Sequence, residues 1–120
     1  MRPLTSNKLT EFLERFQNFE DAEFRSLDVI NATTIKATFA LQDRAREFNW
    51  ITIELEFNGI SDAKLIDNNK LPFVDMSDGI TLVTGSNRFG FSIGKYTFSS
   101  INDALCYIVF DTLKYQESNF

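Results

Sequence analysis

The sequence contains no histidine and only one cysteine. The absence of histidine excludes Ser-His and Cys-His catalytic arrangements and every metal site built on imidazole. A lone cysteine excludes an internal disulfide bond and the cysteine-rich sites of structural zinc and iron–sulfur clusters. Cys106 lies inside the apolar run 104–110, where we expect a buried structural thiol, because reactive thiols need a partly exposed, electropositive setting. These absences predict a protein that is not an enzyme and that holds no cofactor and no metal.

Basic residues are also scarce, since 12 Lys and Arg stand against 17 Asp and Glu, a net charge of −5. Nucleic acids and anionic membranes are bound through Lys and Arg that neutralise phosphates, so neither is expected as a ligand. A macromolecular partner is instead expected to be a basic protein. No window has the length of a membrane span, and residues 1–7 lack the apolar core of a signal peptide. We therefore expect a cytoplasmic location.

Two loops resemble ligand-binding motifs but lack the residue that each motif requires. Residues 85–91 have the glycine spacing of a phosphate-binding loop, with Phe91 in the place of the essential lysine. Asp75, Ser77 and Gly79 resemble the start of a calcium loop, which would need its bidentate acid at Ser86. Neither segment therefore predicts a ligand site.

Five carboxylates remain as candidate functional residues. Glu20, Asp21 and Glu23 cluster in a loop, and Glu54 and Glu56 lie two apart on the solvent face of a strand. A glycosidase-like acid and base pair would need one carboxyl group buried enough to raise its pKa, and nothing in the sequence indicates such burial. One interpretation is that these residues only solvate the surface and protect a sheet edge. The other is a docking patch for a basic partner, because complementary charge accelerates encounter.

A chain of 120 residues is expected to form one domain, residues 1–120. Its N-terminal part is amphipathic, and apolar residues that recur at steps of three and four predict a helix at about 6–17. The region from about 24 to 115 has the alternation of strands. We expect an α+β fold in which this helix packs on a mainly antiparallel sheet of about six to eight strands, curled or folded into two layers. The apolar positions of the helix are Leu9, Phe12, Leu13, Phe16 and Phe19.

The clearest strand, residues 50–57, alternates apolar with polar side chains and ends at Asn58 and Gly59. Asn-Gly after an alternating run predicts a β-hairpin, since both residues tolerate a positive φ. A loop of three residues, 57–59, would keep Asp62 and Lys64 off the core. It would place Ile60 on the outer face. The inner positions of the returning strand would then be Ser61, Ala63 and Leu65, opposite Leu55, Ile53 and Ile51.

Further strands are expected on both sides of this segment. Alternation predicts a pair of strands joined by a turn at 31–33, and another pair at about 80–83 and 89–93. Residues 42–47 are predicted to be a solvated loop. Residues 104–115 fit either a helix or a strand, and their β-branched and aromatic side chains favour a strand.

Phenylalanine is abundant, with 13 residues against three Tyr and one Trp. Phe carries a large apolar surface and no polar atom, so the rings are expected to fill the space between helix and sheet. The alternative is a carrier that shelters a small hydrophobic ligand there. The rings that would surround such a ligand are those of Phe12, Phe16, Phe39, Phe89 and Phe91.

The order of a helix, the segment 19–27 and the strand at 50–60 resembles small uncharacterised bacterial β-rich domains, some of which are toxin-immunity proteins. Relatives of this kind often have a histidine where this chain has Glu20. The resemblance implies a bacterial, cytoplasmic β-rich domain with an inhibitory role and transfers no site residue. We therefore expect a non-enzymatic protein-binding domain of the immunity, inhibitory or scaffolding kind that acts on a basic partner. The sequence does not predict the oligomeric state.

Overall fold

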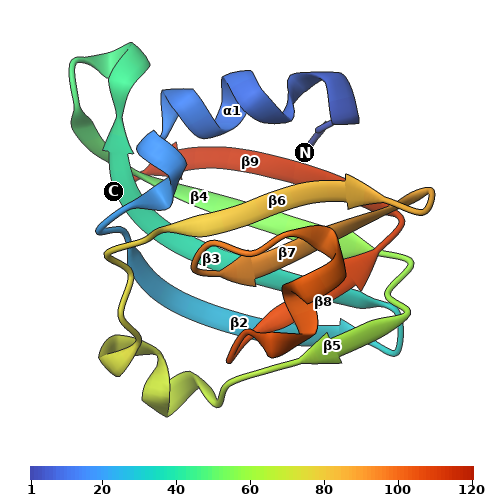
Figure 1. Cartoon of the computed structure of the whole chain (residues 1–120). Helices are drawn as coiled ribbons and strands as arrows, with labels where there is room; N and C mark the ends of the chain where they lie inside the picture. Colours follow the sequence, from blue (N-terminus) through green and yellow to red (C-terminus); the bar gives the residue numbers. More distant parts are fainter.

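The computed structural model describes residues 1–120 and contains two antiparallel sheets that pack against each other around one core (Figure 1). The strand order is β1-β9-β4-β3-β2 in the five-stranded sheet and β5-β8-β7-β6 in the four-stranded sheet. The predicted α+β fold is thus confirmed in its two-layer form, but with nine strands instead of about six to eight, one of them only two residues long. The strands are β1 (Arg2–Pro3), β2 (Glu23–Asn31), β3 (Thr34–Asp43), β4 (Asn49–Asn58), β5 (Asp62–Lys64), β6 (Ile80–Gly85), β7 (Arg88–Ile93), β8 (Tyr107–Phe110) and β9 (Thr112–Asn119).

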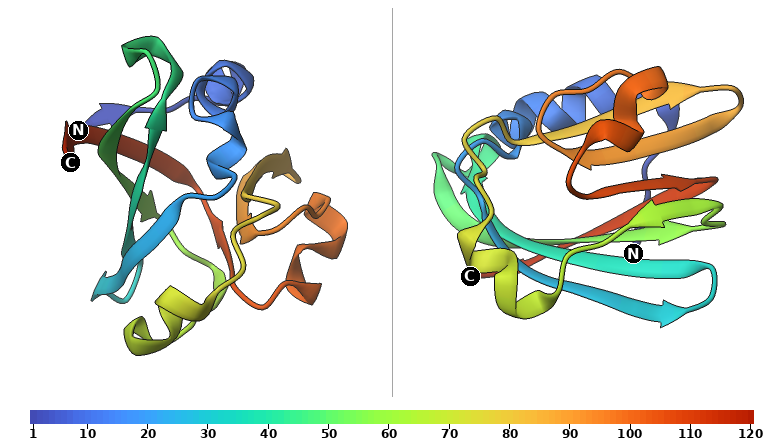
Figure 2. Two further views of the ribbon diagram at one scale, coloured as in Figure 1. Left: turned by 90° about the vertical axis from the view of Figure 1, so that its left-hand side faces the viewer. Right: turned by 60° about the horizontal axis from the view of Figure 1, so that its bottom comes forward.

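The N-terminal helix lies along the open edge between the two sheets, beside β9 and β6 (Figures 1 and 2). It consists of a 3-10 turn, η1 (Ser6–Lys8), and α1 (Leu9–Arg15), close to the predicted range. Phe12 and Phe16 are buried, and the Phe12 ring meets Tyr115 of β9 at a centroid distance of 4.9 Å. The helix therefore closes one end of the core rather than covering the face of a sheet. None of the helices is both long and apolar enough to span a membrane.

Aromatic rings from both sheets fill the interior. Phe57 of the first sheet lies 4.9 Å from Phe91 and 4.9 Å from Phe110 of the second, measured between ring centroids. Phe39 is in contact with Phe24 at 4.5 Å and with Phe19 at 5.1 Å. Edge-to-face and stacked pairs at these distances are the preferred geometry of packed aromatic cores. Four of the five rings proposed to shelter a ligand, Phe12, Phe16, Phe39 and Phe91, are themselves buried in this core, and Phe89 is half-buried.

The predicted hairpin at Asn58 and Gly59 is wrong. β4 is paired with β3 on one side and β9 on the other, so no edge is left for the strand that follows it. The chain instead turns out of the first sheet at Gly59, and β5 pairs with β8 in the second. The positive φ expected at Gly59 is present at +70°. Ile60, expected on the outer face, packs against the core.

The other predicted pairings are confirmed. β2 and β3 form a hairpin around residues 32–33, β6 pairs with β7, and the ambiguous region 104–115 contains the strands β8 and β9. The solvated loop at 42–47 is wrong at its start, because β3 continues to Asp43 and that side chain is fully buried. Only a single 3-10 turn, η3 (Arg44–Arg46), separates Asp43 from the turn into β4.

Candidate functional site

The segment that follows β5 is held against the edge of the first sheet by one side chain. The 3-10 turn η4 (Asn68–Phe73) begins with Asn68, whose Oδ1 accepts from the backbone N–H of Leu27 at 2.8 Å. Its Nδ2 donates to the Leu27 carbonyl at 3.0 Å, so the amide replaces a neighbouring strand. Leu71 is 1% exposed and anchors the turn in the core. Phe73, two residues later, is 87% exposed.

A cleft of about 700 Å³ opens between η4, the end of β7 and the segment that leads into β8. Its volume lies in the range of ligand-binding clefts, about 300–1,000 Å³. Most of the side chains that line it are apolar or aromatic, including Ile66, Val74 and Ile93. The lining residues are Leu65, Ile66, Asp67, Lys70, Phe73, Val74, Asp75, Asp78, Ile93, Gly94, Tyr96 and Leu105.

Leu105 is on the rim of this cleft because of strand-like alternation at the entry to β8. Ala104 and Cys106 on either side are fully buried, so the side chain between them points outward and is 76% exposed. Burial raises the pKa of the Cys106 thiol to about 12. Cys106 is therefore the structural thiol expected from the sequence, and it fixes the position of Leu105 rather than supplying a reactive group to the cleft.

The cleft carries an excess of negative charge. Asp67, Asp75 and Asp78 line it together with one base, Lys70. Asp75 accepts a hydrogen bond at 2.9 Å from the backbone N–H of Ser77, which lowers the pKa of that carboxyl group and keeps it ionised. Outside the lining, Lys64 and Lys95 are next to lining residues in the sequence, and Asp103 precedes Leu105 by two positions.

The predicted acidic loop reaches the same end of the molecule. The backbone N–H of Asp21 donates to the carbonyl of Met76 at 2.8 Å, which lays residues 18–22 beside residues 75–79 (Figure 2, left). Gly79 in turn accepts at 2.9 Å from the backbone N–H of Gly94 in the cleft wall. We call the exposed carboxylates of the cleft lining and of the adjoining loop 18–22 the acidic face. Its members are Glu20, Asp21, Asp67, Asp75 and Asp78.

The third predicted loop residue, Glu23, lies at the margin of this surface. It lines a smaller cleft of about 440 Å³ that shares Val74 with the larger one. Its carboxylate pairs with Arg25 at 3.1 Å. Glu23 therefore adds less unpaired negative charge than the two acids that precede it.

Glu54 and Glu56 occupy the outer face of β4, away from the cleft lining. Glu54 forms an ion pair with Lys36 of β3 at 3.3 Å, and Glu56 lies opposite Lys114 of β9. Cross-strand pairs of opposite charge of this kind neutralise each other on a solvated sheet. The structure thus places the loop of Glu20 and Asp21 beside residues 75–79, which contribute Asp75 and Asp78 to the cleft lining. It leaves the strand pair on a separate surface of nearly balanced charge.

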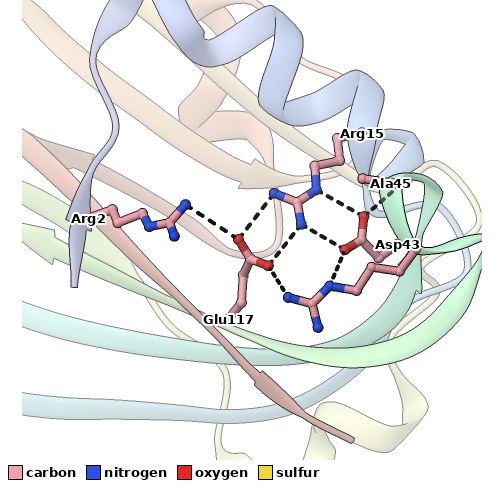
Figure 3. A network of polar contacts seen from close by, with 6 residues as sticks. Arg2, Arg15, Asp43, Ala45 and Glu117 are labelled. Carbon is pink, nitrogen blue, oxygen red and sulfur yellow. Dashed lines mark hydrogen bonds and ion pairs between the residues drawn. The ribbon is translucent and has the colours of Figure 1, made fainter.

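A second polar cluster, which the sequence did not predict, joins α1 to β9 and to the end of β3, the two strands that flank β4 (Figure 3). Nε and Nη2 of Arg15 donate to Asp43 at 2.9 and 2.7 Å, and its two terminal nitrogens donate to Glu117 at 3.1 and 2.8 Å. Arg46 bridges the same two carboxylates at 3.2 and 2.8 Å. The hydrogen bonds from Arg15 lower the pKa values of Asp43 and Glu117. Since every carboxylate oxygen has a cationic partner, this cluster is a structural clamp.

The lining of the cleft has groups that suit the binding of cationic and apolar ligands. No three or more His, Cys, Asp or Glu side chains gather where they could hold a metal ion. The cleft combines apolar walls with carboxylates that accept hydrogen bonds and attract cations. The sequence singled out Glu20 and Asp21 by their clustering but missed Phe73 and Leu105, which form the apolar rim. A search against family models, curated proteins and solved structures finds no match for the chain.

Proposed function

We propose that this chain is a non-enzymatic protein-binding domain that docks a basic partner on the acidic face and acts as an inhibitor or scaffold of the immunity kind. The observation that carries the proposal is an apolar cleft lined by three exposed carboxylates and a single lysine, with Glu20 and Asp21 on the adjoining loop. Such a surface attracts cations over a distance and offers apolar area at contact.

Two physical features support a protein rather than a nucleic acid or a membrane as the partner. The net charge of −5 repels phosphates, and the cleft itself is lined by three aspartates and only one lysine. The apolar side chains Phe73 and Leu105 are exposed on the same cleft as Asp67, Asp75 and Asp78. An apolar centre with a charged rim is the usual anatomy of protein interfaces.

The test begins with affinity capture from the native cell and identification of the partner by mass spectrometry. The rate at which the partner associates with this protein is then measured for wild type and for the double variant Asp75→Asn/Asp78→Asn. Asn at position 75 retains an acceptor for the Ser77 N–H, so the turn is kept while the charge is removed. Glu54→Gln/Glu56→Gln is the matched control, because it removes two charges from the separate outer face.

We expect a basic partner whose association rate falls several-fold for the cleft variant and falls for wild type as salt is added. The control variant should associate at nearly the wild-type rate. A captured partner with an acidic surface, or an association rate that is insensitive to both salt and the cleft variant, would contradict the proposal. An effect of the control alone would move the docking site to the outer face of β4.

A small hydrophobic ligand is the second candidate, and the volume of the cleft favours it. About 700 Å³ is sufficient for a drug-sized molecule. Because rings fill the space between helix and sheets, the carrier alternative now places its ligand in this surface cleft. Native mass spectrometry of the purified protein distinguishes the two candidates, since a carrier should retain a stoichiometric small-molecule adduct and a protein-binding domain should not.

A further inference from the structure

The cleft displays large apolar side chains that are exposed to solvent. Phe73 is 87% exposed, Leu105 is 76% exposed and Leu65 is 38% exposed, and all three line the same cleft. Leu71 and Cys106, their buried neighbours, already anchor the two segments in the core. Exposed apolar groups that converge on one concave surface mark an interaction site more often than isolated ones do.

We infer that this cleft is an anchor pocket for a large apolar side chain of the basic partner, flanked on both sides by Lys or Arg. The inference rests on the proposed function and specifies which side chains of the partner the cleft recognises. The apolar side chain would pack between Phe73 and Leu105. The flanking cations would reach Asp67, Asp75 and Asp78, which lie on the same lining.

The size and the wall chemistry of the cleft fit this occupant. A volume of about 700 Å³ exceeds one aromatic side chain and leaves room for the aliphatic stems of neighbouring lysines. Those stems would lie along apolar wall residues such as Val74 and Ile93, while the ammonium groups stay in water beside the carboxylates. Tyr96 and Phe73 add aromatic faces that attract cations as well as apolar groups.

Two other ligands could bind an apolar cleft, a second copy of this chain and a lipid surface, and the negative charge of the protein disfavours both. A second copy of this chain would carry another net charge of −5 to a surface that is already acidic, and like charges across an interface are costly. An anionic lipid surface would be repelled for the same reason. A basic polypeptide satisfies the apolar walls and the carboxylates together.

The test uses three blocked pentapeptides and the full chain. The first, Lys-Lys-Trp-Lys-Lys, has both features of the expected ligand. The second, Lys-Lys-Ser-Lys-Lys, keeps only the charge, and the third, Glu-Glu-Trp-Glu-Glu, keeps only the apolar side chain. Amide NMR titrations give the affinity of each peptide and the residues that it perturbs.

We expect the first peptide to bind about tenfold or more tightly than the other two, with saturable shifts at Val74, Gly94 and Leu105. Phe73→Ser and Leu105→Ser should each weaken its binding several-fold. Both residues are exposed, so both variants should keep the wild-type fold. Phe48→Ser is the matched control, because Phe48 is a phenylalanine that is 48% exposed and lies outside the cleft lining.

Each other outcome overturns the inference in a distinguishable way. If both lysine peptides bind equally at the acidic face, the anchor pocket is wrong and the proposed function stands. If both tryptophan peptides bind equally, the cleft is an apolar ligand site and the basic partner is wrong. If neither lysine peptide binds, the inference and the proposed function both fail. Wild-type affinity for Phe73→Ser and Leu105→Ser would place the peptide elsewhere.

Discussion

Asp43 holds three parts of the chain together although its side chain has no contact with solvent. Its two oxygens accept from Arg15 of the helix, and Oδ1 also accepts at 2.9 Å from the backbone N–H of Ala45. A buried carboxylate is tolerated only when charged donors replace the water that it loses. Asp43 therefore depends on Arg15, and the loop at 44–46 depends on Asp43.

We predict that Asp43→Ala lowers the free energy of unfolding by about 2–3 kcal/mol, because it removes one partner from a buried ion pair and leaves the N–H of Ala45 without an acceptor. Urea titration measures the change. Asp103→Ala, at an exposed aspartate, should stay within about 0.5 kcal/mol of wild type. Equal midpoints for the two variants would show that the clamp contributes nothing to stability.

The sequence contained a signal for the position of Leu105 but none for that of Asp43. Leu105 lies between two small residues, Ala104 and Cys106, and alternation alone would have placed it outside a core strand. Asp43 gave no such signal, because its charge suggests solvent and its partners, Arg15 and Glu117, are 28 and 74 positions away in the sequence. Only the folded chain brings these three residues together.

At the scale of the elements, Gly59 marks a corner where the chain passes from one sheet to the other. The return crossing lies directly beside it, since the backbone N–H of Asp111, between β8 and β9, donates to Asn58 at 2.9 Å. The Asn-Gly pair correctly predicted the positive φ of Gly59. A positive φ, however, is compatible both with a β-hairpin and with a turn that carries the chain from one sheet to the other. A hairpin is impossible here because β3 and β9 already pair with the two edges of β4. These pairings join residues far apart in the sequence, so the local pattern could not predict them.

We predict that Gly59→Val lowers the free energy of unfolding by more than about 1 kcal/mol. A β-branched residue strongly disfavours a φ of +70°, and a Cβ at this position would lie 2.8 Å from the Cβ of Asp111. Ser61→Val, two residues later and exposed, is the control for the added side chain. Indistinguishable urea midpoints for the two variants would exclude a strained corner at Gly59.

At the scale of the whole molecule, the sequence predicted the class of fold and left open whether the strands form one curled sheet or two layers; it did not assign the strands to the two sheets. Alternation located most of the strands, because the inward side of each strand is apolar whichever sheet contains it. The partners of β5 and β9 depend on which edges are free when the chain folds, and periodicity carries no information on that. The acidic face is also a whole-molecule property, since loops 20–21, 67–78 and the end of β7 meet only in the folded state.

Low pH should decrease the free energy of unfolding, because the two carboxylates of the clamp become protonated. Hydrogen bonds from Arg15 hold the pKa values of Asp43 and Glu117 below their ordinary values, which are near 4. The unfolded chain then binds more protons than the folded one in acid, so this contribution is complete above about pH 5 and is lost as the pH falls through the lowered folded pKa values. Protonation of other acids changes the net charge as well, from −5 at pH 7 through zero near pH 4.6 to positive values below it, so charge repulsion first falls and then rises.

The comparison that isolates the clamp is therefore between wild type and Asp43→Asn/Glu117→Gln, with urea unfolding measured from pH 7 to pH 3. We expect the double variant to be less stable than wild type at pH 7 and the gap between them to narrow steadily below about pH 5, because wild type alone loses the clamp's electrostatic contribution there. The surface carboxylates are common to both proteins, so their effect cancels in the difference. A gap that stays constant from pH 7 to pH 3 would mean that neither carboxylate has a lowered pKa in the folded state, and Arg15 would then hold the helix in place by packing alone.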